Sequence, residues 1–272
     1  MNMKKATVIV AIVMGALLLG AVILGVLNGL LAGGAWNFGW NDYRYDDSAY
    51  SVGEGTLYAP LLTHIDVDWI DGKVEIVACE DQYPSLSERC DSELTEESRV
   101  HWYVSEDGKS LSVKYRASSG FFGSIEGKSK DLILRIPKKM MGGLESLVVH
   151  SVSSPIVLSG IEAKKFEVSG VSGVILLDDC GAETLSLTNV SGAIDASLKQ
   201  TPKSIQTDNV SGETVLSIPK DSGFSLGFET VSGGNPLVDF ATTQKDGRIL
   251  CGDGRCRIDT KSVSGSLRVT YP

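Results

Sequence analysis

The tripeptide Val-Ser-Gly recurs along the second half of the chain at a nearly constant interval. Its copies begin at Val152 (a degenerate Val-Ser-Ser), Val171, Val190, Val210, Val231 and Val263. The steps are 19 to 21 residues long except the last, which is 32. Short alternating apolar segments flank the copies. A fixed period near 20 residues with short strands is typical of a solenoid, in which each coil buries its apolar face only against its neighbours.

Each complete copy ends in a glycine at the same point of its coil. These corner glycines are Gly173, Gly192, Gly212, Gly233 and Gly265. Glycine at such a point permits a left-handed or tightly bent corner. The 32-residue step corresponds to one coil plus an insertion of about 12 residues, which we expect to project from the solenoid or to hold its final turn.

A second alternating pattern precedes the repeats. Ile65, Val67 and Trp69 alternate with polar residues, Asp71-Gly72 follows, and a further apolar alternation continues to Ala78. Asp-Gly between two alternating segments predicts a β-hairpin. We therefore expect residues 61–146 to form an N-terminal β cap region for the solenoid of residues 147–272.

Two loops interrupt this cap region. Residues 83–99 form an acidic insertion, which we expect to be a solvated loop or a short helix. The loop around Phe121 and Phe122 carries an exposed aromatic pair and is a candidate contact loop.

The N-terminus is uncharged over a long stretch. Residues 6–41 contain no Asp, Glu, Lys or Arg, and Lys4 and Lys5 precede them. Residues 8–31 are long enough, at about 1.5 Å per residue, to cross a bilayer as a helix. The alternative is a cleaved signal peptide, although its apolar core would usually be only about 7–15 residues long. Either alternative exports the rest of the chain.

These observations predict the domain organisation. It comprises a cytoplasmic tip (1–7), a transmembrane helix or uncleaved signal anchor (8–31), a juxtamembrane tether (32–60), the β cap region (61–146) and the solenoid (147–272). The expected fold class is all-β: a β-solenoid, or single-stranded β-helix-like stack of repeats of about 20 residues, with a β-hairpin cap region and one preceding transmembrane helix. The expected location is the cell membrane, single-pass, with the bulk of the chain extracytoplasmic.

Small residues recur every four positions within the apolar stretch, at Ala21, Gly25, Gly29 and Gly33. On a helix they form one smooth face that would allow two backbones to approach closely. A homodimer through this helix-pairing face is therefore one expectation.

The charge balance excludes one class of partner. The chain has a net charge of −9, and residues 42–272 alone carry 23 basic and 34 acidic side chains, a net of −11. Nucleic-acid binding needs a positive field to displace counterions from phosphates. We therefore expect no nucleic-acid partner.

Five cysteines lie in the exported part. Cys79 and Cys90 flank an acidic loop, Cys251 and Cys256 flank a Gly-Asp-Gly-Arg segment, and Cys180 is left over. Both close pairs are candidate disulfides, because disulfides persist outside the cytoplasm. Cys180 is expected to be a buried thiol. No metal or cofactor site is expected, since the histidines are scattered without ligand spacing at His64, His101 and His150.

The order of these segments resembles a known family. Residues 65–76, residues 131–137 and the spaced Val-Ser-Gly strands ending at residues 254–265 together resemble the bacterial putative-adhesin family of β-strand-repeat proteins, otherwise described as a domain of unknown function. The resemblance covers roughly residues 60–270. It implies a β-solenoid-like fold in an envelope protein and transfers no catalytic residues.

Three functions are open at this point. The first is a non-catalytic, membrane-anchored binding scaffold of the envelope, with an unknown envelope, glycan or protein ligand. The second is an envelope-stress regulatory or sensor accessory that acts through a membrane partner. The third is a polysaccharide-active β-helix enzyme. The acidic residues that such an enzyme would use follow successive Val-Ser-Gly copies at unequal offsets, so they should not stack into one site. They are Asp178, Asp179, Asp195 and Glu213. We therefore expect no catalytic residues.

Overall fold

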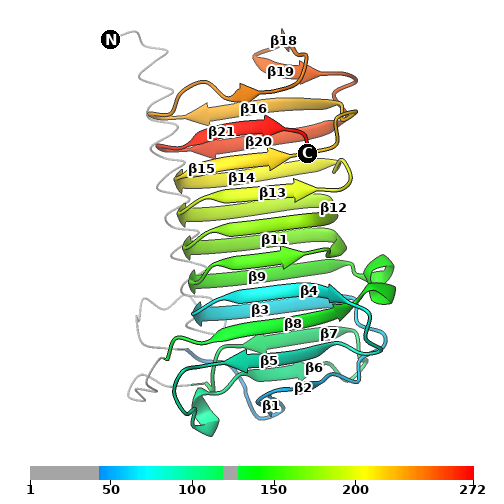
Figure 1. The fold of residues 1–272 in the computed structure, drawn as a ribbon, viewed down its shortest axis with the longest axis vertical. Coiled ribbons are helices and arrows are strands. Elements are labelled where there is room, and N and C mark those ends of the chain that lie inside the picture. Colours follow the sequence, from blue (N-terminus) through cyan, green and yellow to red (C-terminus); the bar gives the residue numbers. More distant parts are fainter. Residues whose placement is uncertain (1–42, 119–127) are drawn as a thin grey trace.

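The chain forms a tall stack of β-coils (Figure 1). The structure is a computed structural model and describes residues 43–118 and 128–272. These residues contain twenty-one strands and two short 3-10 helices, η1 (Glu96–Ser98) and η2 (Lys138–Gly143). The fold of the described residues is therefore all-β.

The strands form two faces, which we call sheet I and sheet II. In spatial order, sheet I contains β1 (Ser51–Val52), β6 (His101–Val104), β7 (Ser110–Lys114), β3 (His64–Asp71), β9 (Ser146–Ser153), β11 (Glu162–Ser172), the second half of β12 (Ile175–Ser191), β14 (Ser204–Ser211), β20 (Cys256–Ser262), β16 (Phe224–Thr230), β19 (Arg248–Cys251) and β18 (Thr243–Lys245).

Sheet II follows the same order along the stack. It contains β2 (Gly55–Thr56), β5 (Ser85–Arg89), β8 (Asp131–Pro137), β4 (Val74–Cys79), β10 (Ile156–Ser159), the first half of β12, β13 (Ile194–Leu198), β15 (Glu213–Ser217), β21 (Ser266–Thr270) and β17 (Leu237–Val238). Strand β12 belongs to both sheets, so the two faces form one curled 21-stranded sheet.

The core is a set of apolar columns between the two sheets. Alternate side chains point inward along each strand, and parallel in-register pairing places like residues above one another. One column of sheet I runs through Ile65, Leu147, Phe166, Leu185, Ile205, Ile258 and Leu226. Each of these side chains is at most 2% exposed. Burial of one such side chain stabilises the fold by roughly 1.5–3 kcal/mol.

The coils do not stack in the order of the chain. Coil β3–β4 lies between coil β7–β8 and coil β9–β10, although it comes first in sequence. At the other end, coil β20–β21 lies between coil β14–β15 and coil β16–β17, although it comes last. The first and last coils are thus internal. The expected single-stranded β-helix-like stack is thereby corrected to one curled sheet of 21 strands, in which the coils near both ends are out of chain order.

The expected N-terminal hairpin is wrong. Strands β3 and β4 lie in different sheets and pair with remote strands: β3 with β7 and β9, and β4 with β8 and β10. Asp71-Gly72 forms the corner between them, where Gly72 has φ +99°. The sequence pattern was ambiguous, because a glycine with positive φ suits a solenoid corner as well as a hairpin turn.

The transmembrane part of the expected fold class has no support among the described residues. Over residues 43–118 and 128–272, no helix is long and apolar enough to cross a membrane. The stretch 8–31 and its predicted helix-pairing face, Ala21, Gly25, Gly29 and Gly33, lie outside the described residues.

Candidate functional site

The five corner glycines lie at one corner of the stack, one above another. A Cβ atom on Gly192 would lie 2.1 Å from the carbonyl oxygen of Gly173, and one on Gly212 would lie 2.2 Å from that of Gly192. The column continues through Gly265 and Gly233. A Cβ atom on Gly265 would lie 2.3 Å from the carbonyl oxygen of Gly212, and one on Gly233 would lie 2.3 Å from that of Gly265. These glycines allow the coils to approach closely, so their role is structural.

A buried amide column supports this corner. The side-chain amides of Asn189 and Asn209 donate hydrogen bonds to the carbonyl oxygens of Gly173 (2.9 Å) and Gly192 (3.2 Å). Both asparagines are at most 1% exposed. The repeat pattern did not predict this role, although each asparagine stands three residues before a corner glycine.

The candidate disulfides are not formed. All five cysteines are free thiols. Cys79 is the register partner of Pro137, whereas Cys90 follows Arg89, the partner of Asp131. The two cysteines therefore lie at opposite ends of β8, about 20 Å apart at 3.3 Å per residue. A disulfide requires Cα atoms within about 7 Å.

The second candidate pair is separated by a strand. Cys251 and Cys256 are the register partners of Phe224 on its two sides. Two strand spacings place their backbones about 10 Å apart. Burial raises the pKa of the Cys256 thiol to about 12. Cys180 is fully buried, and burial raises the pKa of its thiol to about 11.

Two other predicted features can be placed only in part. Phe121 and Phe122 lie outside the described residues. His64, His101 and His150 lie on β3, β6 and β9. In the parts of the chain that the structure describes, no group of three or more His, Cys, Asp or Glu side chains is placed to hold a metal ion.

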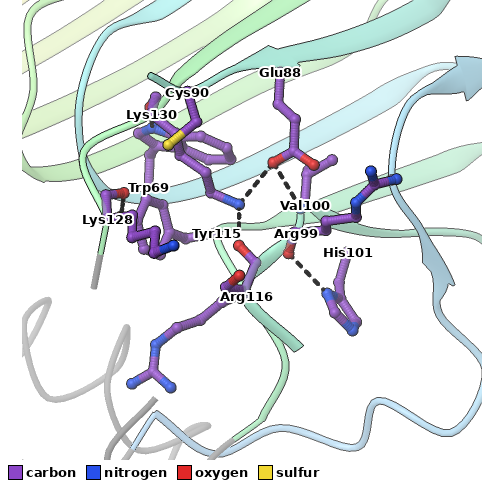
Figure 2. A network of polar contacts seen from close by, with 12 residues as sticks. Trp69, Glu88, Cys90, Arg99, Val100, His101, Tyr115, Arg116, Lys128 and Lys130 are labelled. Atoms are coloured by element: carbon purple, nitrogen blue, oxygen red, sulfur yellow. Dashed lines mark hydrogen bonds and ion pairs between the residues drawn. The ribbon is translucent and has the colours of Figure 1, made fainter. Parts of the chain in front are cut away.

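A buried lysine lies in the coil next to the N-terminal end of the stack (Figure 2). The ammonium group of Lys130 is fully buried and donates hydrogen bonds to Glu88 (2.8 Å) and to the carbonyl oxygen of Ser98 (2.6 Å). It also lies 5.2 Å from the ring centre of Trp69 and 4.8 Å from that of Tyr115. Burial lowers the pKa of Lys130 to about 8, although Glu88 opposes this shift.

The partners of Lys130 are themselves engaged. Glu88 accepts a hydrogen bond from the backbone N–H of Val100 (2.9 Å), and the Trp69 indole donates one to the backbone carbonyl of Lys130 (3.0 Å). The cluster joins β5 to β8 and to the segment after η1. We interpret it as a clamp that holds the end coil, because its hydrogen-bonding groups are occupied within the fold.

A polar cleft of about 330 Å³ opens on the outer face of sheet I, near the C-terminal end of the stack. Its lining residues come from β14, β16, β19 and β20: Gln206, Asp208, Gly227, Glu229, Arg248, Arg257, Asp259, Thr260 and Lys261. Gly227 is the register partner of Asp259 and contributes no side chain to this face. The missing side chain leaves the hollow.

Arg248 fills part of that hollow and forms a fixed wall. A Cβ atom on Gly227 would lie 2.6 Å from its guanidinium. The guanidinium donates hydrogen bonds to Asp259 (2.7 Å), to the hydroxyl and carbonyl oxygens of Ser225 (2.8 Å each) and to the carbonyl oxygen of Ile258 (2.9 Å). Arg257 donates to the other carboxylate oxygen of Asp259 at 2.6 Å. Burial opposes ionisation of Asp259, but the hydrogen bonds from the two arginines lower its pKa.

Beside this wall stands a row of alternating charges, which we call the charged row. It consists of Asp208, Lys261 and Glu229, which are register neighbours on β14, β20 and β16. Lys261 and Glu229 are exposed. Asp208 accepts a hydrogen bond from the Gln206 amide (2.8 Å).

None of these cleft residues was predicted. The sequence signal was present: the outward positions that hold Ser186 and Thr188 on β12 become Gln206 and Asp208 on β14. The cleft itself could not be found, because β14 and β20 are about 50 residues apart in the chain and meet only through the exchanged coil order.

Part of this chain matches a known family model. Residues 144–270 match the model of a family described as Toastrack DUF4097. The stack itself begins before this match, since the coils β3–β4 and β7–β8 precede residue 144. A search of curated proteins found no match.

Two solved structures are similar. One is the crystal structure of a "putative cell adhesion protein" from Clostridium sporogenes, with a TM-score of 0.50 and 12% identity over 82% of this chain and 99% of that one. The other is a "putative adhesin" from Bacteroides fragilis, with a TM-score of 0.35 and 9% identity over 82% of this chain and 97% of that one. The first likeness shows a shared fold.

Proposed function

We propose that this chain is a non-catalytic, extracytoplasmic binding scaffold of adhesin-like character, with the cleft on sheet I as its contact site. The observation that carries the proposal is the cleft: a fixed arginine wall beside exposed charged side chains on the face of a rigid sheet. A stack of coils offers a long surface for such contacts. The fold shared with the clostridial protein supports adhesion as the kind of binding.

The placement of carboxylates supports a role without catalysis. Glycoside hydrolysis requires a pair of carboxylates facing each other across the scissile bond. On sheet II, Asp195 has the apolar register partners Leu176 and Val215.

The sequence supports a location outside the cytoplasm. Lys4 and Lys5 precede 36 residues without any charged side chain, a pattern typical of exported chains. The strongly acidic remainder is consistent with a soluble surface facing an aqueous compartment.

The proposal is tested by coupling the purified full-length chain to beads and measuring retention of intact bacterial cells and of isolated cell-wall polysaccharide. The double variant Lys261→Met/Glu229→Leu should retain about tenfold less, because it removes two exposed groups of the contact site. The matched control is Lys165→Met/Glu167→Leu, an exposed ion pair on β11 of the same sheet. No retention by wild-type beads, or catalytic release of soluble sugars, would overturn the proposal.

A further inference from the structure

The charged groups of the cleft divide into two sets. Arg248 is held by Asp259 and by backbone carbonyls, so it has little capacity left for a ligand, whereas Arg257 uses two of its five N–H donors on Asp259. Lys261 and Glu229 form no ion pair within residues 43–118 and 128–272, although they are neighbours on adjacent strands. The second set therefore faces the open cleft.

The charged row offers hydrogen-bond donors and acceptors at regular spacing, although Asp208 is only 5% exposed and already accepts a hydrogen bond from Gln206. An ammonium group supplies donors only, and a carboxylate supplies acceptors only. Asp208, Lys261 and Glu229 stand on successive strands, about 4.8 Å apart, so acceptor, donor and acceptor alternate. A hydroxyl group donates and accepts at once, so a ligand with several neighbouring hydroxyls can satisfy all three side chains.

The charge of the lining argues for a neutral ligand. Arg248, Arg257 and Lys261 balance the three carboxylates of Asp208, Asp259 and Glu229, so the cleft as a whole carries no formal net charge. A site that selects an anion or a cation normally concentrates one sign of charge. This cleft has no such excess.

Size and polarity narrow the ligand further. About 330 Å³ is near the lower limit for a small-molecule site, and the lining is polar rather than apolar. An apolar ligand would leave these polar groups desolvated without partners, which is unfavourable. One or two sugar rings match both the volume and the hydrogen-bonding pattern.

We propose that the cleft binds a neutral, hydroxyl-rich saccharide through Asp208, Lys261 and Glu229. This inference rests on the proposed binding function and assigns its ligand class. The Arg248–Asp259–Arg257 wall positions the saccharide by shape, and the charged row recognises its hydroxyls.

Calorimetric titration of the full-length chain tests the ligand class with four trisaccharide probes. Two are neutral (maltotriose and N,N′,N″-triacetylchitotriose), one is anionic (trigalacturonate) and one is cationic (glucosamine trimer). At least one neutral probe should bind about tenfold more tightly than both charged probes. Its Kd should change little between low and high salt. Salt screens attraction between charges, and a neutral ligand carries no charge to be attracted.

Two substitutions at one position separate hydroxyl recognition from charge recognition. Glu229→Gln keeps a hydrogen-bond acceptor and should weaken a neutral saccharide only a few-fold, whereas Glu229→Leu should weaken it about tenfold or more. Glu167→Leu on β11 is the control and should leave the Kd unchanged. Equal losses in Glu229→Gln and Glu229→Leu would indicate a cationic ligand and overturn the inference.

Further outcomes separate this inference from the proposed function. Preference for a charged probe would overturn the ligand class. Neutral-probe binding that is unaffected by Glu229→Leu would overturn the site. If no probe binds while the beads still retain cells, the saccharide inference fails and the binding function stands; if cell retention also fails, both are wrong.

Discussion

Gly192 shows, at the scale of the single residue, why the repeat keeps a glycine at its corner. Its φ is +130°, and the carbonyl oxygen of Gly173 occupies the space where a methyl group would stand. Gly192→Ala should therefore destabilise the protein by roughly 2–4 kcal/mol, because both the backbone conformation and the coil contact resist a side chain.

The measurement for Gly192→Ala is the free energy of unfolding in a denaturant titration. Gly234→Ala is the matched control, since a Cβ atom there meets nothing within 4 Å. It should change stability by no more than about 0.5 kcal/mol. Equal stabilities for the two variants would contradict close packing at the corner.

Lys130 makes a second prediction at this scale, one that concerns pH. In the folded chain its pKa is lowered to about 8 by burial, whereas an unfolded lysine titrates near 10.4. Between these values the unfolded chain binds a proton that the folded chain has lost, so the free energy of unfolding rises with pH. Below about pH 8 both states are protonated and this dependence disappears.

The comparison with Lys130→Met isolates this effect. Between about pH 8 and pH 10 the wild type should gain on the order of 2 kcal/mol relative to the variant. A difference that is constant with pH, or that shrinks as pH rises, would contradict a desolvated ammonium group at this position.

At the scale of the element, the strands could be predicted but their order could not. Alternation and corner glycines mark each strand, because period-two burial and tight corners leave a local signal. Coil order leaves none. Ile258 packs between Ile205 and Leu226, and any other coil with an apolar residue at that position would pack similarly. The hairpin predicted around Asp71-Gly72 was wrong for the same reason, because the local pattern does not say which strands β3 and β4 pair with.

Cysteine pairing and the cleft show the same limit. Cys79 and Cys90 are close in sequence, yet strand β8 separates them along its whole length. Conversely, Asp208 and Lys261 are far apart in sequence and are register neighbours. Proximity along the chain is a poor guide where pairing is parallel and each neighbour lies at least one coil away.

At the scale of the whole molecule, the first parallel coil and the last coil of the chain are not the outermost coils of the stack. The first coil, β3–β4, and the last, β20–β21, each have a neighbouring coil on both sides (Figure 1). In a sequential solenoid, terminal coils have one neighbour and open most readily. Here the last coil of the chain and its first parallel coil are held inside the stack, whereas the short strands β1 and β2 lie at its outer edge.

Native-state hydrogen exchange distinguishes the two arrangements. The amides of β20 and β21 should exchange more slowly than those of β17 and β18, although they lie nearer the C-terminus, because opening β20 requires breaking ladders on both of its sides. The two-residue strands β1 and β17 serve as internal references for the fast-exchanging ends. Exchange of β20 and β21 at the rate of β17 would show that the last coil opens as a terminal coil does, and that the exchanged order does not govern the stability of the stack.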